Sequence, residues 1–292
     1  MCFPQNFHSR AEVENIFDRA YSEVKRIEDK FTDFHPSDFN KINDLAGIRE
    51  CCVDEEIFSL VEKSLSFSEK SKGIFDISFA SVGHVWRKAR EHSKEYSMRD
   101  RADLVQYINY KKIKLDKKKR SIFLPYKEMK IGLGGIGKGY AVDRAFALLR
   151  AAGLYNFYIN GSGDIRVHAR NDAPRPWKIA IRNPLSQDAH KSVGLIQLAN
   201  GAVATSGSYL QKMDNRDGEL DHHIIHAATG RSVGEIISAT VLSSSSLETD
   251  VTATILMNLS VVEALLYVQT HGLYAVIIDR HGKSYKNNPT SK

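Results

Sequence analysis

Apolar residues near the start of the chain recur every three or four positions, as on one face of a helix: Val13, Ile16, Phe17, Ala20, Val24, Ile27 and Phe31. Just before them, Ser9 and Glu12 have the spacing of a capping box, in which each side chain satisfies a backbone N–H at a helix start. The pattern therefore predicts an amphipathic helix over about residues 10–32.

Further helical patterns cover about residues 55–70, 99–108, 138–152 and 247–270. Glycines close two of these segments. Gly73 follows the first and Gly153 follows the third, and glycine suits the left-handed conformation that often ends a helix. The last segment is expected to break near Ser260.

The second half of the chain consists mainly of short strands, predicted at about 157–159, 165–168, 177–182, 193–198, 202–204 and 237–243. Asn200-Gly201 is a strong hairpin signal, and further hairpins are expected around 116–119 and 280–282. This mixture favours an α+β fold with antiparallel strands over a doubly wound nucleotide-binding fold. We find no repeat or linker, so a single domain over 1–292 is expected, with a polar tail at 286–292.

The composition is that of an ordinary globular protein, with 42% hydrophobic and 26% charged residues in 292. The formal net charge of +6 suits a polyanionic ligand such as a dinucleotide. The densest basic run, Lys111–Arg120, has no interleaved aromatic residues for stacking on bases. A solvated hairpin tip is therefore favoured there, and a nucleic-acid partner is not expected.

Cys2, Cys51 and Cys52 form neither a disulfide framework nor a zinc-ligand pattern. No apolar stretch approaches the roughly 18 residues of a membrane-spanning helix, so no membrane span is expected. The N-terminal residues also lack the basic and apolar regions of a recognisable signal peptide.

The most informative segment is Gly134–Asp143, in which four glycines follow an apolar run and open a predicted helix. Such a turn lets the backbone approach a ligand closely and presents unpaired N–H groups at the positive end of the helix dipole. Lys138 adds a charge at the same place. The segment therefore predicts an anion site, and phosphate is the usual anion at such a site.

Asp250 and Thr254 lie four residues apart at a predicted helix start, so their side chains share a face. A carboxylate and a hydroxyl on one face can hold a hard cation such as Mg²⁺. The alternative is that Asp250 only complements the helix dipole and that Thr254 is half-buried.

Other segments carry weaker signals. Thr205-Ser206-Gly207 is either a turn that donates hydrogen bonds to phosphate or ribose, or an ordinary turn. Asp76 is an acidic residue at a turn and by itself indicates little.

The histidines of the segment 222–226 suggest zinc, but His222 and His223 would point to opposite sides of a strand, and no cysteine or carboxylate set completes a site. A single histidine that acts as a general base is the preferred interpretation, because its ordinary pKa lies near neutrality.

Taken together and in this order, these segments resemble the ApbE family, the FAD:protein FMN transferases. The resemblance covers about residues 10–280 and rests on Phe34–Asp38 with Asn43, Phe75–Ser78, Gly134–Asp143, Asn160–Ile165, Thr205–Gly207, His223–Ile225 with Thr229-Gly230, and Asp250–Thr254. It implies a T-fold-like α+β core. It also implies that FAD binds with Mg²⁺, that FMN is transferred to a threonine hydroxyl of an acceptor flavoprotein subunit or domain carrying a flavinylation motif, and that AMP is released.

The resemblance also implies roles for individual residues. Asp250, Thr254 and the backbone carbonyl of Gly137 match the metal-binding positions, and His223 matches the histidine near the reacting phosphate. The residues expected to line the FAD site are Asp76, Gly135, Lys138, Asp164, Thr205, Ser206, Tyr209 and Ile225.

The chain departs from the family pattern at three places. Gly137 stands where an alanine is usual, Gly132 where an acidic residue precedes the glycine turn, and His226-Ala227 where Asp-Pro follows the histidine segment. The change at Gly137 should be tolerated, because a backbone carbonyl ligand does not depend on the side chain. Some members of the family instead hydrolyse FAD, so one alternative to the transferase is an FAD pyrophosphatase that yields FMN and AMP. The change at His226 motivates a second alternative, a flavin-binding protein that has lost catalysis.

Overall fold

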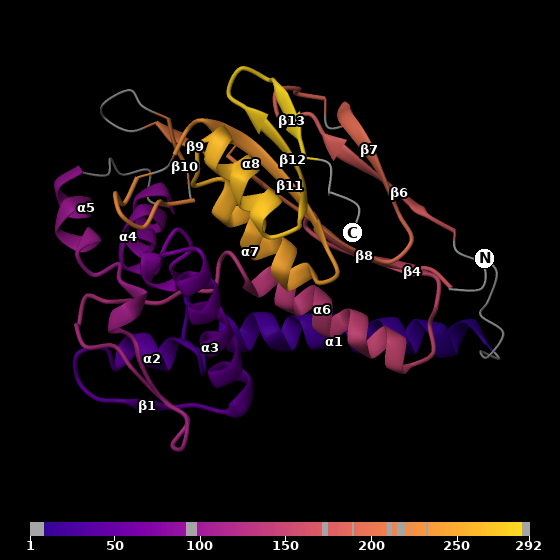
Figure 1. Cartoon of the computed structure of the whole chain (residues 1–292). Coiled ribbons are helices and arrows are strands. Elements are labelled where there is room, and N and C mark those ends of the chain that lie inside the picture. Colours follow the sequence, from indigo (N-terminus) through magenta and orange to yellow (C-terminus); the bar gives the residue numbers. More distant parts are fainter. Residues whose placement is uncertain are drawn as a thin grey trace.

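A computed structural model describes residues 9–91, 98–170, 175–188, 190–208, 212–214, 220–222, 224–231 and 233–287 (Figure 1). Its helices are α1 (Arg10–Phe31), α2 (Asn40–Asp44), α3 (Glu55–Lys70), α4 (Ala80–Glu91), α5 (Met98–Val105), α6 (Gly137–Ala151), α7 (Ser246–Leu256) and α8 (Val261–Thr270), with 3-10 turns η1 (Ile77–Phe79) and η2 (Tyr110–Lys112). Its strands are β1 (Cys51–Cys52), β2 (Lys114–Asp116), β3 (Ser121–Phe123), β4 (Phe157–Gly161), β5 (Asp164–His168), β6 (Trp177–Arg182), β7 (Ser192–Leu198), β8 (Gly201–Gly207), β9 (Lys212–Asp214), β10 (Leu220–His222), β11 (Ile236–Ser243), β12 (Tyr274–Asp279) and β13 (Ser284–Lys286).

The largest sheet has six strands in the order β13-β12-β11-β8-β5-β4, and all its neighbours are antiparallel. Helices α6, α7 and α8 pack on one face (Figure 1). The β6–β7 ribbon packs on the other, and alternation along β12 shows how. Ala275 and Ile277 join the core on the helix side, whereas Val276 packs with Ile181 and Ile196 of the ribbon. The predicted α+β class with antiparallel sheets is confirmed.

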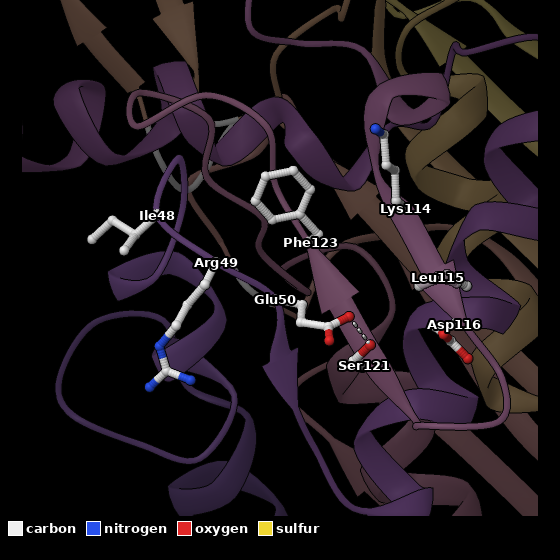
Figure 2. Close-up of a pocket in the computed structure, with 8 residues that line it drawn as sticks. All are labelled: Ile48, Arg49, Glu50, Lys114, Leu115, Asp116, Ser121 and Phe123. Carbon is white, nitrogen blue, oxygen red and sulfur yellow. Dashed lines mark hydrogen bonds between the residues drawn. The ribbon is translucent and has the colours of Figure 1, made fainter.

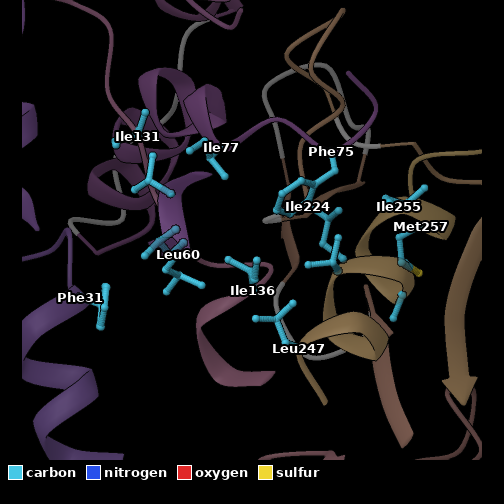
Figure 3. Close-up of a cluster of buried hydrophobic side chains, with 14 of the residues drawn as sticks. Phe31, Leu60, Phe75, Ile77, Ile131, Ile136, Ile224, Leu247, Ile255 and Met257 are labelled. Atoms are coloured by element: carbon cyan, nitrogen blue, oxygen red, sulfur yellow. The ribbon is translucent and has the colours of Figure 1, made fainter. Parts of the chain in front are cut away.

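The first half of the chain packs against this helical layer. Helix α1 lies along α6, and the small β1-β3-β2 sheet lies beside α2 and α3 (Figure 1). Phe31 of α1, Leu60 of α3, Ile136 before α6 and Leu247 of α7 belong to one buried apolar cluster (Figure 3). This cluster joins the first half of the chain to the helical layer on the sheet, and a single domain over 1–292 stays a prediction.

The helices with clear start and stop signals are confirmed. Ser9 Oγ accepts a hydrogen bond from the Glu12 N–H (3.2 Å) at the start of α1. Gly73 and Gly153 have positive φ values of 86° and 84° after α3 and α6. The expected break near Ser260 is also present, because α7 ends at Leu256 and a capping box at Ser260 starts α8. The last predicted helical segment is therefore two helices, and the second starts at the capping residue Ser260.

Helix α4 was not predicted from the sequence. It contains Gly83 and the β-branched residues Val82 and Val85, all of which have low helix propensity. The helix is nevertheless stable in the fold because Val82 and Trp86 are buried against Ile225. Tertiary packing, not helix propensity, therefore determines that this segment is helical. The neighbouring helix α5, expected over about 99–108, spans Met98–Val105.

The prediction of a turn at Thr205-Ser206-Gly207 is wrong, because these residues extend strand β8. Thr205 pairs with Thr240 of β11, Ser206 with Ala239 and Gly207 with Ser238. Pairing with β11 satisfies the backbone groups of this small-residue segment, which would otherwise favour a turn.

Among the described residues, no helix has both the length and the apolar character that crossing a membrane requires.

Replacement of Gly139 by alanine should destabilise the protein. A Cβ at Gly139 would lie 2.3 Å from the Ser246 carbonyl oxygen and 2.7 Å from the Leu247 Cα, so backbone would have to move. We expect the free energy of unfolding to fall by about 3 kcal/mol, measured by urea denaturation. Gly234→Ala is the control, because its Cβ would meet nothing within 4 Å. Equal stabilities of the two variants would contradict the close contact between α6 and α7.

Candidate active site

The starts of helices α6 and α7 lie against each other, backbone to backbone. The contact is possible because Gly139 has no side chain where it faces Ser246 and Leu247. This close approach brings the glycine turn, which precedes α6, next to the helix that carries Asp250 and Thr254. The two segments that the sequence singled out separately therefore form one site.

The carboxylate of Asp250 caps helix α6 from outside that helix. The Gly139 N–H donates to its Oδ2 (3.0 Å), and the Lys138 ammonium donates to its Oδ1 (2.9 Å). The residue in the N-cap position, Ile136, offers no side-chain hydrogen bond. Asp250 is buried, and a buried carboxylate is stabilised at the positive end of a helix dipole. The anion at this helix start is thus supplied by the protein itself.

Asp143 of α6 makes the reciprocal interaction with helix α7. Its carboxylate accepts hydrogen bonds from Ser245 Oγ (2.7 Å) and from the N–H groups of Ser246 (2.9 Å) and Leu247 (3.1 Å). Arg166 of β5 donates to the same carboxylate. Asp143 belongs to the glycine segment Gly134–Asp143, but the sequence pattern indicates no role of its own for this residue. Its position four residues after Gly139, on the same helix face, was the available signal.

Asp164 reaches the site from the tight hairpin between β4 and β5. Ser162 (φ 57°) and Gly163 (φ 102°) take left-handed conformations there, and the Gly163 N–H donates to Asn160 Oδ1 (2.9 Å). Asp164 Oδ2 lies 3.1 Å from the Lys138 nitrogen. Two buried carboxylates, those of Asp164 and Asp250, therefore share one ammonium group.

The electrostatics of this cluster follow from burial and charge. Burial, reinforced by the charge of Asp250, raises the pKa of Asp164 to about 7, although Lys138 acts in the opposite direction. Burial of the Lys138 ammonium acts to lower its pKa, but the two carboxylates outweigh burial and raise the pKa above its ordinary value. Lys138 is therefore charged at neutral pH, and the cluster carries an excess of acidic groups.

Thr254 lies one helical turn after Asp250, and its hydroxyl donates to the Asp250 carbonyl (3.0 Å). A Cβ at Gly135 would lie 3.0 Å from Thr254 Oγ1, so the glycine turn fits closely over this hydroxyl. Gly137 is the first residue of α6, and its N–H donates to the Leu133 carbonyl (2.7 Å). The structure therefore places Gly135 against Thr254, and Lys138, the residue after Gly137, against Asp250.

The donor set of this site fits a hard divalent cation. The Asp250 carboxylate, the Thr254 hydroxyl and the Gly137 carbonyl are all oxygen donors, which Mg²⁺ prefers, and Mg²⁺ keeps several waters in such sites. The described residues contain no group of three or more His, Cys, Asp or Glu side chains placed to hold a metal. A metal site here would therefore depend on one carboxylate with neutral oxygen ligands and water.

The Asp76 side chain makes hydrogen bonds within the protein that join two turns. Its carboxylate accepts hydrogen bonds from Ser78 N–H (2.8 Å), Ser78 Oγ (2.6 Å) and the Tyr110 N–H (2.8 Å), and burial raises its pKa. It thereby joins η1 to η2. The preceding Phe75 is the residue that reaches the glycine turn, because a Cβ at Gly135 would lie 3.2 Å from its ring.

The remaining predicted site residues are distributed over other parts of the fold. The hydroxyls of Thr205 and Thr240 are 2.9 Å apart between β8 and β11, and Ser206 follows in the same strand. Ile225 is buried against α4. His223 and Tyr209 lie outside the described residues, so their predicted roles stay predictions.

His226 is one of the histidines of the segment 222–226 and also a departure from the family pattern. Its Nδ1 is buried and has no hydrogen-bond partner among the described residues, and burial lowers its pKa. Its imidazole is therefore neutral near pH 7.

Two surface hollows lie on other elements. One, of about 370 Å³, is formed by the small β1-β3-β2 sheet and the segment before it; Figure 2 shows its lining, which includes Glu50, Ser121 and Phe123. The other, of about 640 Å³, lies between the end of α1 and the start of α3 and is lined by Arg26, Lys30 and Asp54. Neither includes a residue of the Asp250 cluster.

Comparison with known proteins agrees with the resemblance seen in the sequence. The family model of ApbE, described as the ApbE family, matches residues 5–278. The FAD:protein FMN transferase of Klebsiella pneumoniae (strain 342) is 29% identical over 253 residues, which cover 85% of this chain and 77% of that protein. The enzyme of the same name from Vibrio cholerae serotype O1 is 24% identical over 96% of this chain and 83% of its own.

Solved structures have the same fold. The crystal structure of the ApbE protein from Thermotoga maritima matches with a TM-score of 0.85 and 26% identity, over 98% of this chain and 92% of that chain. The flavin transferase ApbE from Vibrio cholerae matches with a TM-score of 0.80 and 23% identity, over 99% and 92% of the two chains.

Asp143→Asn should weaken the start of α7. An amide retains the shape of the side chain but directs an N–H₂ donor toward backbone N–H groups and removes the charge that Arg166 meets. We expect the free energy of unfolding to fall by about 2–3 kcal/mol, measured by urea denaturation. Asp18→Asn, on the exposed face of α1, is the matched control. A loss no larger than that of the control would contradict the capping role.

The raised pKa of Asp164 makes stability depend on pH. Its contribution is fully present below its ordinary pKa of 3.8 and is lost as the pH rises through about 7. Asp164→Asn cannot titrate. The wild type should therefore lose roughly 2–4 kcal/mol more of its free energy of unfolding between pH 4 and pH 7 than Asp164→Asn loses. Urea denaturation in EDTA at both pH values measures this, and a constant difference would contradict it.

Proposed function

The chain belongs to the ApbE family, and we propose that it transfers FMN from FAD to a threonine hydroxyl of an acceptor flavoprotein, releasing AMP. The acceptor would be a subunit or domain that carries a flavinylation motif. The observation that carries the proposal is the Asp250 cluster, in which the glycine turn, Lys138 and Thr254 gather at the start of α6. The names of the relatives and the match over most of the chain support it.

Asp250, Thr254 and the backbone carbonyl of Gly137 would hold Mg²⁺. Phosphoryl transfer depends on positioning and charge neutralisation more than on covalent chemistry, and bound Mg²⁺ supplies neutralisation of diphosphate charge. The close contact of α6 and α7 at Gly139 supports this assignment, because it holds together the two helices that carry these residues. The excess of acidic groups in the cluster favours a divalent cation over a bare phosphate.

The chain's own groups would position the reactants. The Lys138 ammonium is charged and its side chain is half-exposed, so the ammonium can contact a phosphate oxygen while the stem stays on α6. The acceptor hydroxyl oxygen would form a bond to the FMN phosphorus, and the bond from that phosphorus to the bridging oxygen would break, so that AMP leaves with this oxygen. His223 is the residue we assign, from the sequence resemblance, to take the hydroxyl proton.

The proposal is tested by AMP release from FAD with Mg²⁺, with and without an acceptor domain that carries a flavinylation motif. Covalent FMN on the acceptor is detected by in-gel fluorescence. AMP together with a fluorescent acceptor supports the transferase. AMP with free FMN and a dark acceptor would replace it by an FAD pyrophosphatase, and bound FAD without AMP would indicate a flavin-binding protein.

Asp250→Asn should lower the rate of FMN transfer by at least about 100-fold, because an amide is a poor ligand for a hard cation and removes the charge at the site. Lys178→Met, an exposed position on β6, is the control and should retain the wild-type rate. Circular dichroism confirms that both variants fold. A wild-type rate in folded Asp250→Asn would rule out the metal role of Asp250.

A further inference from the structure

The Lys138 ammonium contacts Asp250, the carboxylate on which the proposed metal site depends. Its nitrogen lies 2.9 Å from Asp250 Oδ1, while the other carboxylate oxygen is held by the Gly139 N–H. The Gly139 bond fixes the orientation of the carboxylate and leaves Oδ1 as the oxygen that meets a cation. An ammonium at this distance and a metal ion on the same oxygen would repel each other strongly.

The side chain of Lys138 has open space beside it, whereas the side chains of its two partners are enclosed. The Lys138 side chain is 49% exposed, but those of Asp250 and Asp164 are 2% and 3% exposed. A lysine ammonium sits on a flexible four-carbon stem, so it can exchange partners without backbone movement.

Asp164 provides the second position for this ammonium. Asp164 Oδ2 is buried and lies 3.1 Å from the Lys138 nitrogen, yet no donor among the described residues is aligned to hydrogen-bond with it. A small rotation of Lys138 away from Asp250 would give this oxygen a well-aligned donor. The contact between Lys138 and Asp164 is therefore an ion pair without an aligned hydrogen bond, and such a rotation would strengthen it.

A counter-charge is needed whenever the metal is absent. Two buried carboxylates without a cation would be strongly destabilising, since the charge of a buried group must be compensated nearby. The Lys138 ammonium supplies this compensation.

We propose that Lys138 is a built-in substitute for the metal ion: it neutralises Asp250 in the metal-free protein, and an entering divalent cation displaces it toward Asp164. This inference rests on the proposed metal site. Displacement turns the ammonium from a competitor of the metal into a group free to meet the ligand's phosphates beside Asp164.

The test is a titration with Mn²⁺ in the absence of FAD, in which the electron paramagnetic resonance signal of free Mn²⁺ reports binding. Lys138→Met removes the competing charge and should bind Mn²⁺ about tenfold tighter than the wild type. Lys138→Gln, which keeps a polar side chain over the carboxylates, should also bind Mn²⁺ more tightly than the wild type. It replaces Lys138→Met in the test if that variant does not fold. Lys178→Met has the same loss of net charge away from the site and should bind like the wild type.

The outcomes separate this inference from the proposed function. Suppose that the Lys138 variants bind Mn²⁺ as the wild type does, or more weakly, while Asp250→Asn abolishes binding. The metal site is then supported, and the proposal that Lys138 takes the place of the metal ion is overturned. If no variant binds Mn²⁺, the metal site fails and the inference fails with it. Tighter binding by the Lys138 variants, lost again when Asp250→Asn is added, supports both.

Discussion

The site depends on reciprocal capping of two helices, in which each helix provides an aspartate that caps the start of the other. Asp250 of α7 caps α6, and Asp143 of α6 caps α7. Each carboxylate lies where unpaired N–H groups and the positive end of a helix dipole favour an anion. This reciprocal capping is geometrically possible only because Gly139 lets the two backbones touch. Once the helices are locked in this way, the positions of Lys138, Thr254 and the glycine turn follow without further adjustment.

This arrangement uses charges for both stability and chemistry. Asp143 meets hydrogen-bond donors and Arg166, so its charge is compensated by the protein. Among the described residues, Asp250 and Asp164 share a single ammonium, that of Lys138, whose side chain is half-exposed. The first carboxylate therefore holds the helices together, whereas the other two retain the capacity to attract a cation. All of these groups stand on helices or on a tight hairpin, which gives a site a more precise geometry than loops do.

The sequence predicted those parts of this design that are local. Periodicity and capping residues located α1, α3, α6 and the α7–α8 pair, and the order of the motifs brought Asp250 and Thr254 to the glycine turn. The contacts that join distant segments were not predictable in this way. Asp143 caps residues about 100 positions later, β8 extends through Thr205 because β11 lies beside it, and α4 depends on burial of Trp86. Each of these is decided by a neighbour that no local pattern reveals.

Gly132 illustrates how such a neighbour can replace a residue that the pattern lacks. The family resemblance leads one to expect an acidic side chain there, before the glycine turn. A Cβ at Gly132 would lie 2.7 Å from Asp33 Oδ2, so the carboxylate of Asp33, just after α1, fills the space beside this backbone. His84 of α4 lies 2.7 Å from the same oxygen, and the Asp33 side chain is 7% exposed. A buried carboxylate thus stands next to residue 132 although the chain provides it from a different element. Glycine at 132 and aspartate at 33 are therefore one structural unit, because any side chain at 132 would collide with the carboxylate.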